Sequence, residues 1–135
     1  MTESDVATAF NRRAVADEDR LLELRLGLAA WLGGLALEHH QAEDVMLAAY
    51  EAMANTVEHA YRGGSGDVEV RGAVADGRLT VTVTDWGRWR SFDASDPARG
   101  RGLILVRGLA EDSELLHRDD GTTVRMAWRV RPRLH

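Results

Sequence analysis

The sequence predicts an α+β fold, a two-layer sandwich in which helices cover one face of a mostly antiparallel sheet. Stretches with helical periodicity occupy the first half of the chain, and alternating segments joined by turn sequences occupy most of the second half. At 135 residues the chain has the size of one domain with one continuous core. No internal repeat or low-complexity segment divides it, so we expect a single domain over residues 1–135.

The first half is expected to hold an edge strand and two helices. Residues 7–16 form the expected short edge strand. The segment 16–32 begins with acidic residues, continues with leucines at helical spacing and is closed by Gly33 and Gly34, which are typical of a helix end. A second helix is expected over residues 42–61, ending before a glycine-rich loop.

The second half is expected to hold two hairpins. The alternating segments 67–74 and 78–85 flank an Ala-Asp-Gly turn at 75–77, and Asp-Gly between alternating segments is a strong hairpin signal. A second alternating pair, within residues 113–130, turns at the Asp-Asp-Gly sequence 119–121. These strands would place their apolar residues on one shared face.

The segment between the hairpins is less regular. Residues 86–102 contain Gly, Pro and Arg without a clear period, so they receive no assignment. Residues 103–110 form a short apolar segment that periodicity alone leaves open between strand and helix. The glycines just before this segment favour a helix N-terminus.

The composition excludes several kinds of site. Cysteine is absent, which removes disulfides, thiolate metal sites and thiol nucleophiles. All 17 basic residues are arginine, which excludes a phosphate-binding loop that ends in Gly-Lys-Ser/Thr and also excludes Schiff-base chemistry. The net charge of −5 argues against direct nucleic-acid binding, although arginines crowd the C-terminus. Without a membrane-spanning or signal-peptide pattern, a cytoplasmic protein with no membrane partner is expected.

Glu51, Asn55 and Glu58 fall within one narrow stripe of the second predicted helix, because they are spaced four and three residues apart. Such a stripe is often only the solvated face of an amphipathic helix. Two features favour a ligand wall instead. The neighbouring alanines allow close approach, and asparagine is a poorer helix former than the Glu or Arg of a typical solvent face.

Asp85 follows Leu79, Val81 and Val83 at a spacing of two, so it shares their apolar face at the end of a strand. A carboxylate in that position needs a partner. It either caps the following turn through its own backbone or accepts a hydrogen bond from the exocyclic amine of a bound ring. In the second case Gly87 keeps the wall free of side chains, so that a flat ring can approach.

Glycines also occur where an anion would bind. Gly100 and Gly102 free the backbone to point N–H groups at an anion, a helix that begins there adds its positive end, and Arg101 adds side-chain charge. An ordinary flexible loop is the alternative. The Gly-Thr-Thr sequence that contains Thr122 and Thr123 leads into a strand, and by itself it is most often a simple turn.

Taken together, four motifs occur in an order that resembles the GHKL ATPase superfamily, most closely the bacterial anti-sigma-factor serine kinases. The segments that carry the resemblance are "EAMANTVEHAY", "VTDWGRW", "RGRGLILVRGLAEDSELL" and "GTTVRM". Each motif alone is weak, whereas all of them in this order are specific. The resemblance implies a Bergerat-type sandwich of the histidine-kinase-like ATPases, which binds ATP and Mg²⁺ between helices and sheet.

The resemblance also implies roles for the matched residues. Glu51 is the implied general base, Asn55 the implied magnesium ligand and Asp85 the implied acceptor for the adenine amine; an amide oxygen suits magnesium, which prefers hard ligands. Further contacts to adenine or phosphate are implied for Gly87, Gly100, Gly102, Thr122 and Thr123.

The implied function is that of an anti-sigma factor with protein serine kinase activity. It would sequester a sigma factor and phosphorylate a serine of a STAS-type anti-sigma antagonist, and a homodimer is left open. Trp86, Arg88, Trp89 and Arg90 depart from the pattern, because many relatives keep a further glycine after the position of Asp85. The run resembles kinase-like domains fused to phosphatase or sensor domains, which leaves open that the chain is part of a larger regulator.

Other functions remain as alternatives. A nucleotide-binding module can sequester its partner without phosphoryl transfer, and a sandwich of this type can also lack a ligand. The catalytic domain of a histidine kinase shares the fold, but too little helical sequence precedes His39 and His40 to build a dimerisation hairpin.

Overall fold

The computed structural model describes residues 9–60, 66–87 and 104–133, without the side chains of residues 59 and 60. In chain order its elements are β1 (Ala9–Val15), α2 (Glu18–Gly33), α3 (His39–Asn55), the π-helical turn η1 (Thr56–Ala60), β2 (Asp67–Ala75), β3 (Arg78–Asp85), a short helix at residues 104–109, β4 (Asp112–Arg118) and β5 (Gly121–Arg129).

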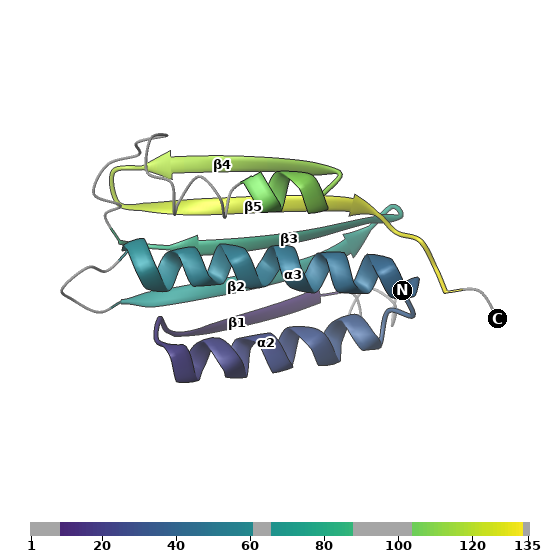
Figure 1. The fold of residues 1–135 in the computed structure, drawn as a ribbon, viewed down its shortest axis with the longest axis horizontal. Coiled ribbons are helices and arrows are strands. Elements are labelled where there is room, and N and C mark those ends of the chain that lie inside the picture. Colours follow the sequence, from purple (N-terminus) through teal and green to yellow (C-terminus); the bar gives the residue numbers. More distant parts are fainter. Residues whose placement is uncertain (1–8, 61–65, 88–103, 134–135) are drawn as a thin grey trace.

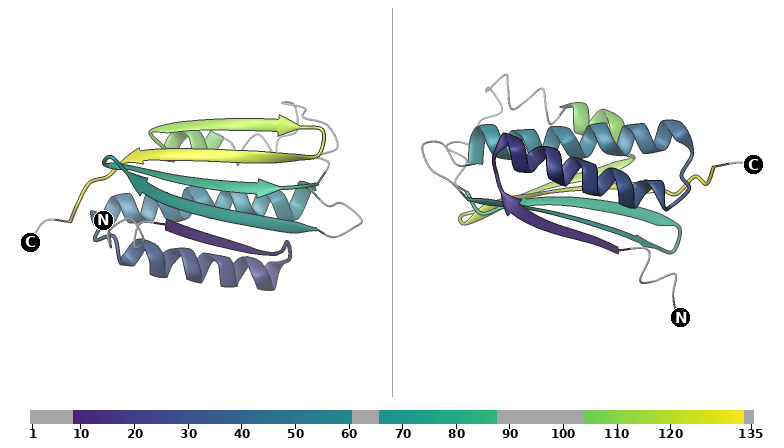
Figure 2. Two further views of the ribbon diagram at one scale, coloured as in Figure 1. Left: turned by 180° about the vertical axis from the view of Figure 1, so that it is seen from behind. Right: turned by 90° about the horizontal axis from the view of Figure 1, so that it is seen from below.

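The strands form one five-stranded sheet in the order β1-β2-β3-β5-β4, with every neighbouring pair antiparallel. The helices lie together on one face of this sheet, and no described element covers the other face (Figure 1 and Figure 2). The predicted two-layer α+β sandwich is therefore confirmed. Among the described residues, no helix has the length and apolar character needed to cross a membrane.

Strand β1 and helix α2 confirm the first two predicted elements. Strand β1 pairs only with β2 and is an edge of the sheet, as expected. Helix α2 begins after Asp17, whose carboxylate accepts a hydrogen bond from the Arg20 amide at 2.8 Å, and Gly34 is its C-cap. The leucines at helical spacing face the sheet and are buried: Leu21, Leu24, Leu28 and Leu32.

Helix α3 begins at His39, three residues before the predicted start at 42. The reason is an N-cap that the apolar pattern does not reveal. The Glu38 carboxylate accepts hydrogen bonds from the amides of His40 and Gln41 at 3.0 and 3.1 Å. The hydrogen bond from His40 holds the pKa of Glu38 below its usual value, against a smaller opposing effect of burial.

The side chain of Gln41 fixes the start of α3 to the end of β5. Its amide nitrogen donates to the carbonyl of Arg129 at 2.6 Å, and its amide oxygen accepts from the backbone N–H of Arg131 at 2.8 Å. Gln41 is only 4% exposed, so these bonds satisfy a buried amide. The first turn of α3 is thereby held to the sheet by polar contacts as well as by packing.

The predicted single helix over 42–61 changes type at Asn55. Residues Thr56–Ala60 form the π-helical turn η1, in which more residues are needed to complete a turn than in an α-helix. Side chains after Asn55 therefore point in directions that α-helical spacing does not predict.

Both predicted hairpins are confirmed. Asp76 and Gly77 join β2 to β3 with φ values of 54° and 74°, the left-handed conformation that a type I′ turn requires. The second turn comprises residues 119–120, because Gly121 already belongs to β5.

The apolar segment that was open between strand and helix contains a helix at residues 104–109, as the preceding glycines favoured. Its Val106 is buried, and the Trp128 indole N–H of β5 donates to the carbonyl of Leu109 at 2.9 Å. This helix lies beside α3 on the helical face of the sheet (Figure 1).

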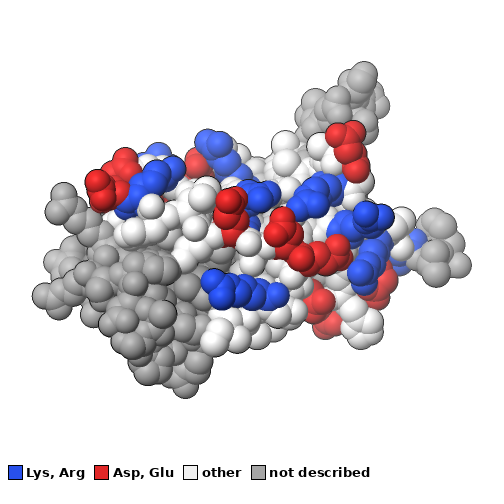
Figure 3. All heavy atoms as spheres, turned by 90° about the horizontal axis from the view of Figure 1, so that it is seen from above, with Lys and Arg blue, Asp and Glu red and all other residues white. Residues whose placement is uncertain are grey.

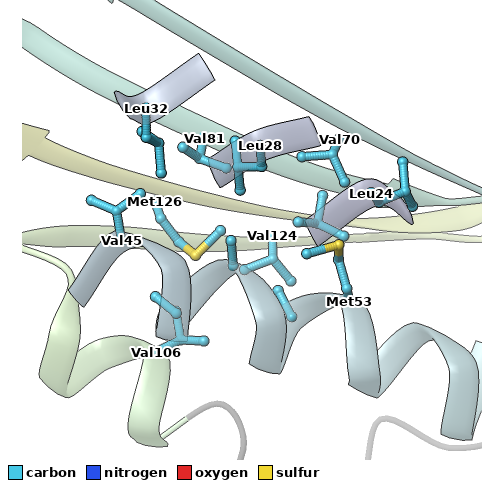
Figure 4. Close-up of a cluster of buried hydrophobic side chains, with 14 of the residues drawn as sticks. Leu24, Leu28, Leu32, Val45, Met53, Val70, Val81, Val106, Val124 and Met126 are labelled. Carbon is cyan, nitrogen blue, oxygen red and sulfur yellow. The ribbon is translucent and has the colours of Figure 1, made fainter. Parts of the chain in front are cut away.

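The core lies between the helices and the sheet (Figure 4). Leucines of α2 meet Val45 and Met53 of α3, and both sets contact the inward residues of the central strands. The labelled strand residues in this cluster are Val70, Val81, Val124 and Met126. Because the core is continuous beneath both long helices, it sets the position of α3 over β3 and β5.

Gly121 is the one residue of the Gly-Thr-Thr sequence that the fold itself explains. A Cβ at this position would collide with the carbonyl oxygen of Asp85 and lie 3.0 Å from the Cα of Trp86. The start of β5 can therefore pack against the end of β3 only if residue 121 has no side chain.

We expect Gly121→Ala to lower the free energy of unfolding by about 2 kcal/mol or more, because the backbone of β3 must move to make room. Chemical denaturation measures the change. Gly33→Ala is the matched control: a Cβ there meets nothing within 4 Å, so the variant should be neutral or slightly more stable. Equal stability of the two variants would show that the contact at Gly121 is not a constraint.

Candidate functional site

Glu51 and Asn55 lie one turn apart on α3, on the side of the helix away from α2. Glu51 is half-buried, whereas Asn55 is only 4% exposed. The Nδ2 atom of Asn55 is buried and has no hydrogen-bond partner. Every other buried side-chain nitrogen or oxygen of the described residues has one. A buried amide without a partner costs stability, so this position is a candidate for a ligand or ion contact.

Asp85 lies at the end of β3 on the inward face, as its spacing predicted, and is 1% exposed. Its Oδ2 accepts a hydrogen bond from the Thr56 hydroxyl at 3.3 Å, and its Oδ1 accepts one from the Gly87 amide at 3.1 Å. The second bond is the local turn cap that the sequence left open as an alternative. Each carboxylate oxygen can accept more than one hydrogen bond, so the cap does not exclude a ligand amine.

Thr56 connects the two halves of the site. It directly follows Asn55, is 2% exposed, and also lies 3.4 Å from the carbonyl of Ala52 while it donates to Asp85. The end of α3 and the end of β3 are therefore in direct contact. Asn55 and Asp85 consequently belong to one buried region between helix and sheet.

The two threonines of the Gly-Thr-Thr sequence lie on opposite faces of the sheet. Thr122 is paired with Asp85 across the β3–β5 ladder, is 1% exposed, and has its hydroxyl 3.1 Å from Nδ1 of His117. Thr123 points to the uncovered face, where its hydroxyl lies 3.1 Å from that of Thr84. Of these two candidates, only Thr122 is beside Asp85 on the inward face.

Glu58 does not lie on the same side of the helix as Glu51 and Asn55. It lies with Val57, Ala54 and Tyr50 along a groove of about 410 Å³ between α2 and the end of α3. The π-helical turn explains the difference, because the expected stripe assumed α-helical spacing through residue 58. Of the two acids predicted to line one wall with Asn55, only Glu51 therefore lies on the same side of the helix.

The remaining candidates divide between described and undescribed residues. Gly87 is buried and lies two residues after Asp85, close to the end of β3, as a wall for a flat ring requires. Gly100, Arg101 and Gly102 lie outside the described residues, and so do the lid positions between Gly87 and Gly100.

The described residues contain no cluster of three or more acidic or histidine side chains that would hold a metal ion without help. Magnesium nevertheless fits the site, because it is often held by one or two protein oxygens together with phosphate and water. The Asn55 amide suits this pattern, since rotation about its last bond can turn either the oxygen or the partnerless nitrogen toward the site.

Sequence reasoning missed Thr56, His117 and Gly121. Thr56 and His117 act through side-chain contacts with residues distant in sequence, so no local spacing marks them. Gly121 had a visible signal, because a glycine before a strand often marks a close approach of another backbone.

Two of the arginines near the C-terminus are paired with acids. Arg125 Nε lies 3.2 Å from Glu114, and Arg131 lies 3.3 Å from Glu111. Figure 3 shows acidic and basic side chains interspersed over the face seen from above. The crowding of arginines in the sequence therefore does not produce a purely basic surface at these described residues.

Known proteins are similar to this chain along most of its length. A family model described as the histidine kinase-like ATPase domain matches residues 14–128. The serine-protein kinases RsbW of Bacillus thuringiensis (strain Al Hakam) and Bacillus cereus (strain AH820) are each 29% identical over 120 residues, covering 76% of this chain and 73% of the relative.

A solved structure gives a matching fold. The RsbU and RsbW domains of Rv1364c from Mycobacterium tuberculosis align with a TM-score of 0.74 and 24% identity, over 94% of this chain and 34% of that one. This chain therefore corresponds to about one third of that longer protein.

The family match runs from the last residues of β1 through most of β5, so it includes Glu51, Asn55, Asp85 and Thr122. The resemblance inferred from the four sequence motifs is confirmed. The chain belongs to the family of the histidine kinase-like ATPase domain.

Proposed function

We propose that this protein is an anti-sigma factor with ATP-dependent serine kinase activity, which binds ATP between α3 and the sheet. The observation that carries the proposal is the buried, partnerless amide nitrogen of Asn55, one residue from the Thr56 contact with Asp85. The two ends of a nucleotide need these two kinds of group: an amide oxygen near the phosphates and a carboxylate near the base. The kinase names of the Bacillus relatives support the same reading.

Asp85 accepts a hydrogen bond from the exocyclic amine of adenine in this proposal. Thr56 and Gly87 already hold its carboxylate in place, which reduces the entropy lost when the base binds. Guanine has a carbonyl oxygen at the equivalent position, and an oxygen facing a carboxylate is repelled. The site therefore favours ATP over GTP.

Asn55 would hold magnesium at the phosphate end, and the ion would offset the negative charge of the phosphates. Because the chain contains no lysine, the remaining phosphate contacts must come from backbone amides and arginine. We assign these contacts to Gly100, Arg101 and Gly102.

Glu51 is the proposed general base. The serine hydroxyl of the antagonist attacks the γ-phosphorus, the bond from that phosphorus to the β–γ bridging oxygen breaks, and ADP leaves. The hydroxyl proton passes to the Glu51 carboxylate, which lies one helical turn from Asn55 on the same side of α3. Its half-buried position keeps the carboxylate accessible to an incoming protein side chain.

The proposed partners are a sigma factor and a STAS-type antagonist that competes with it. Phosphorylation of the antagonist serine would prevent this competition and leave the sigma factor sequestered. Large apolar side chains exposed on α2, such as Leu22 and Leu26, are available as contacts for a protein partner.

Calorimetric titration should show that ATP with magnesium binds more tightly than GTP. Asp85→Asn should weaken ATP binding by about tenfold or more, because hydrogen bonds to charged groups contribute about 1.5–3 kcal/mol. Asp44→Asn, an exposed position on the same helix as Asn55, is the control and should bind as the wild type does. Equal affinity of the wild type for ATP and GTP would contradict the role of Asp85.

Glu51→Ala should lower phosphate transfer from labelled ATP to an antagonist by about 10²-fold or more, as expected for loss of a general base. ATP affinity should stay within about twofold, since Glu51 is not assigned to nucleotide binding. Glu43→Ala is the control, because Glu43 is exposed near the start of α3. Undiminished transfer by Glu51→Ala would remove its assigned role, and absence of transfer by the wild type would favour a non-catalytic binding module.

A further inference from the structure

On the uncovered face of the sheet, Arg13 stacks on Trp86. The guanidinium carbon of Arg13 lies 4.0 Å from the centroid of the Trp86 ring, well within the range of a cation–π contact. Nε of Arg13 is 2.9 Å from Oδ2 of Asp67, which orients the guanidinium group. We call these three residues the Arg13–Trp86 clamp.

The clamp connects three neighbouring strand ends. Arg13 belongs to β1, Asp67 is the first residue of β2, and Trp86 directly follows β3. Strands β1 and β3 are not neighbours in the sheet, so the contact between Arg13 and Trp86 reaches across β2.

Trp86 lies just beyond the last residue of β3 that is paired in the sheet. Asp85 is the last residue of β3 that pairs with β2, opposite Val68, and also the last that pairs with β5, opposite Thr122. Trp86 is one residue beyond both ladders, between the buried carboxylate of Asp85 and the amide of Gly87. A side-chain contact at this residue therefore restrains the backbone on either side of it.

Alternation along the strand gives the two side chains opposite directions. Asp85 faces the helices, and Trp86 faces the uncovered side, where the residue is 38% exposed. Trp86 is thus placed to hold the base-binding segment without itself lying in the buried region. A simple surface role would not require an arginine that is itself fixed by a carboxylate.

We propose that the Arg13–Trp86 clamp positions Asp85 and Gly87 for nucleotide binding from the opposite face of the sheet. The proposal rests on the proposed ATP site and names positioning residues for it. By holding residue 86 on the outer face, the clamp keeps the Gly87 amide on the Asp85 carboxylate and keeps that carboxylate directed at the base. Without the clamp, the strand end would have to become ordered when the nucleotide binds, and this would lower the affinity.

The first test uses the protein without nucleotide. Arg13→Ala should raise the hydrogen-exchange rate of the Gly87 amide, measured by NMR, by about three- to tenfold, which corresponds to the loss of a partly exposed cation–π contact. The exchange rate of the Val83 amide in β3 should be unchanged. An increase at both amides would indicate global unfolding instead of a local effect. Arg13 is about half exposed, so its replacement should leave the fold intact.

The second test measures ATP affinity in the same variants. Arg13→Ala and Trp86→Ala should each weaken ATP binding by about three- to tenfold, and the double variant should be no weaker than either single variant, because both remove one contact. Arg13→Lys keeps a cation near the ring and should restore part of the loss. Arg71→Ala is the matched control: Arg71 is also exposed and ion-paired, 3.1 Å from Glu69 of the same strand, and should bind ATP as the wild type does.

The outcomes separate this proposal from the proposed function. If the wild type binds ATP while Arg13→Ala matches it in both Gly87 exchange and affinity, the clamp has no positioning role. If the wild type does not bind ATP, the ATP site is refuted, and unchanged Gly87 exchange in Arg13→Ala would then overturn the clamp as well. Additive losses in the double variant would also overturn it.

Discussion

The site depends on one buried hydrogen bond, from the Thr56 hydroxyl to the Asp85 carboxylate. This bond joins the end of α3 to the end of β3, and both partners are almost fully buried. A carboxylate in that position is tolerated only because donors compensate for its lost hydration. The opposite end of α3 is fixed in a similar way, since Gln41 bonds to the backbone after β5. Helix α3 is therefore held to the sheet at both ends, which places Asn55 at a defined position.

The change from α-helix to π-helix just after Asn55 is the second constraint on the site. It separates side chains that α-helical spacing would align, so that Glu51 and Asn55 lie on one side of α3 and Glu58 lies in the groove beside α2. Thr56, the first residue of the turn, meets Asp85 at the sheet. π-helical turns inside helices are often found at functional sites, and this one begins at the residue that contacts Asp85.

Much of the fold was predictable because its elements follow from local physical rules. Leucines at helical spacing and glycines at the helix end specify α2, and an Asp-Gly pair between alternating segments specifies the hairpin of β2 and β3. The inward direction of Asp85 followed from strand alternation, which holds whatever the strand packs against. The start of α3 was predicted three residues late, because the cap at Glu38 is not part of the apolar pattern.

The sequence by itself determined the kinds of element, the inward face of β3 and the order of the four motifs, since each depends on residues that are close together in the chain. Only the tertiary structure decided which side chains meet. It paired Asp85 with Thr56, put Thr122 rather than Thr123 beside it, and separated Glu58 from Asn55. The physical reason is that these contacts depend on strand register, on the packing of α3 and on a local change of helix type. Periodicity along the chain contains none of these.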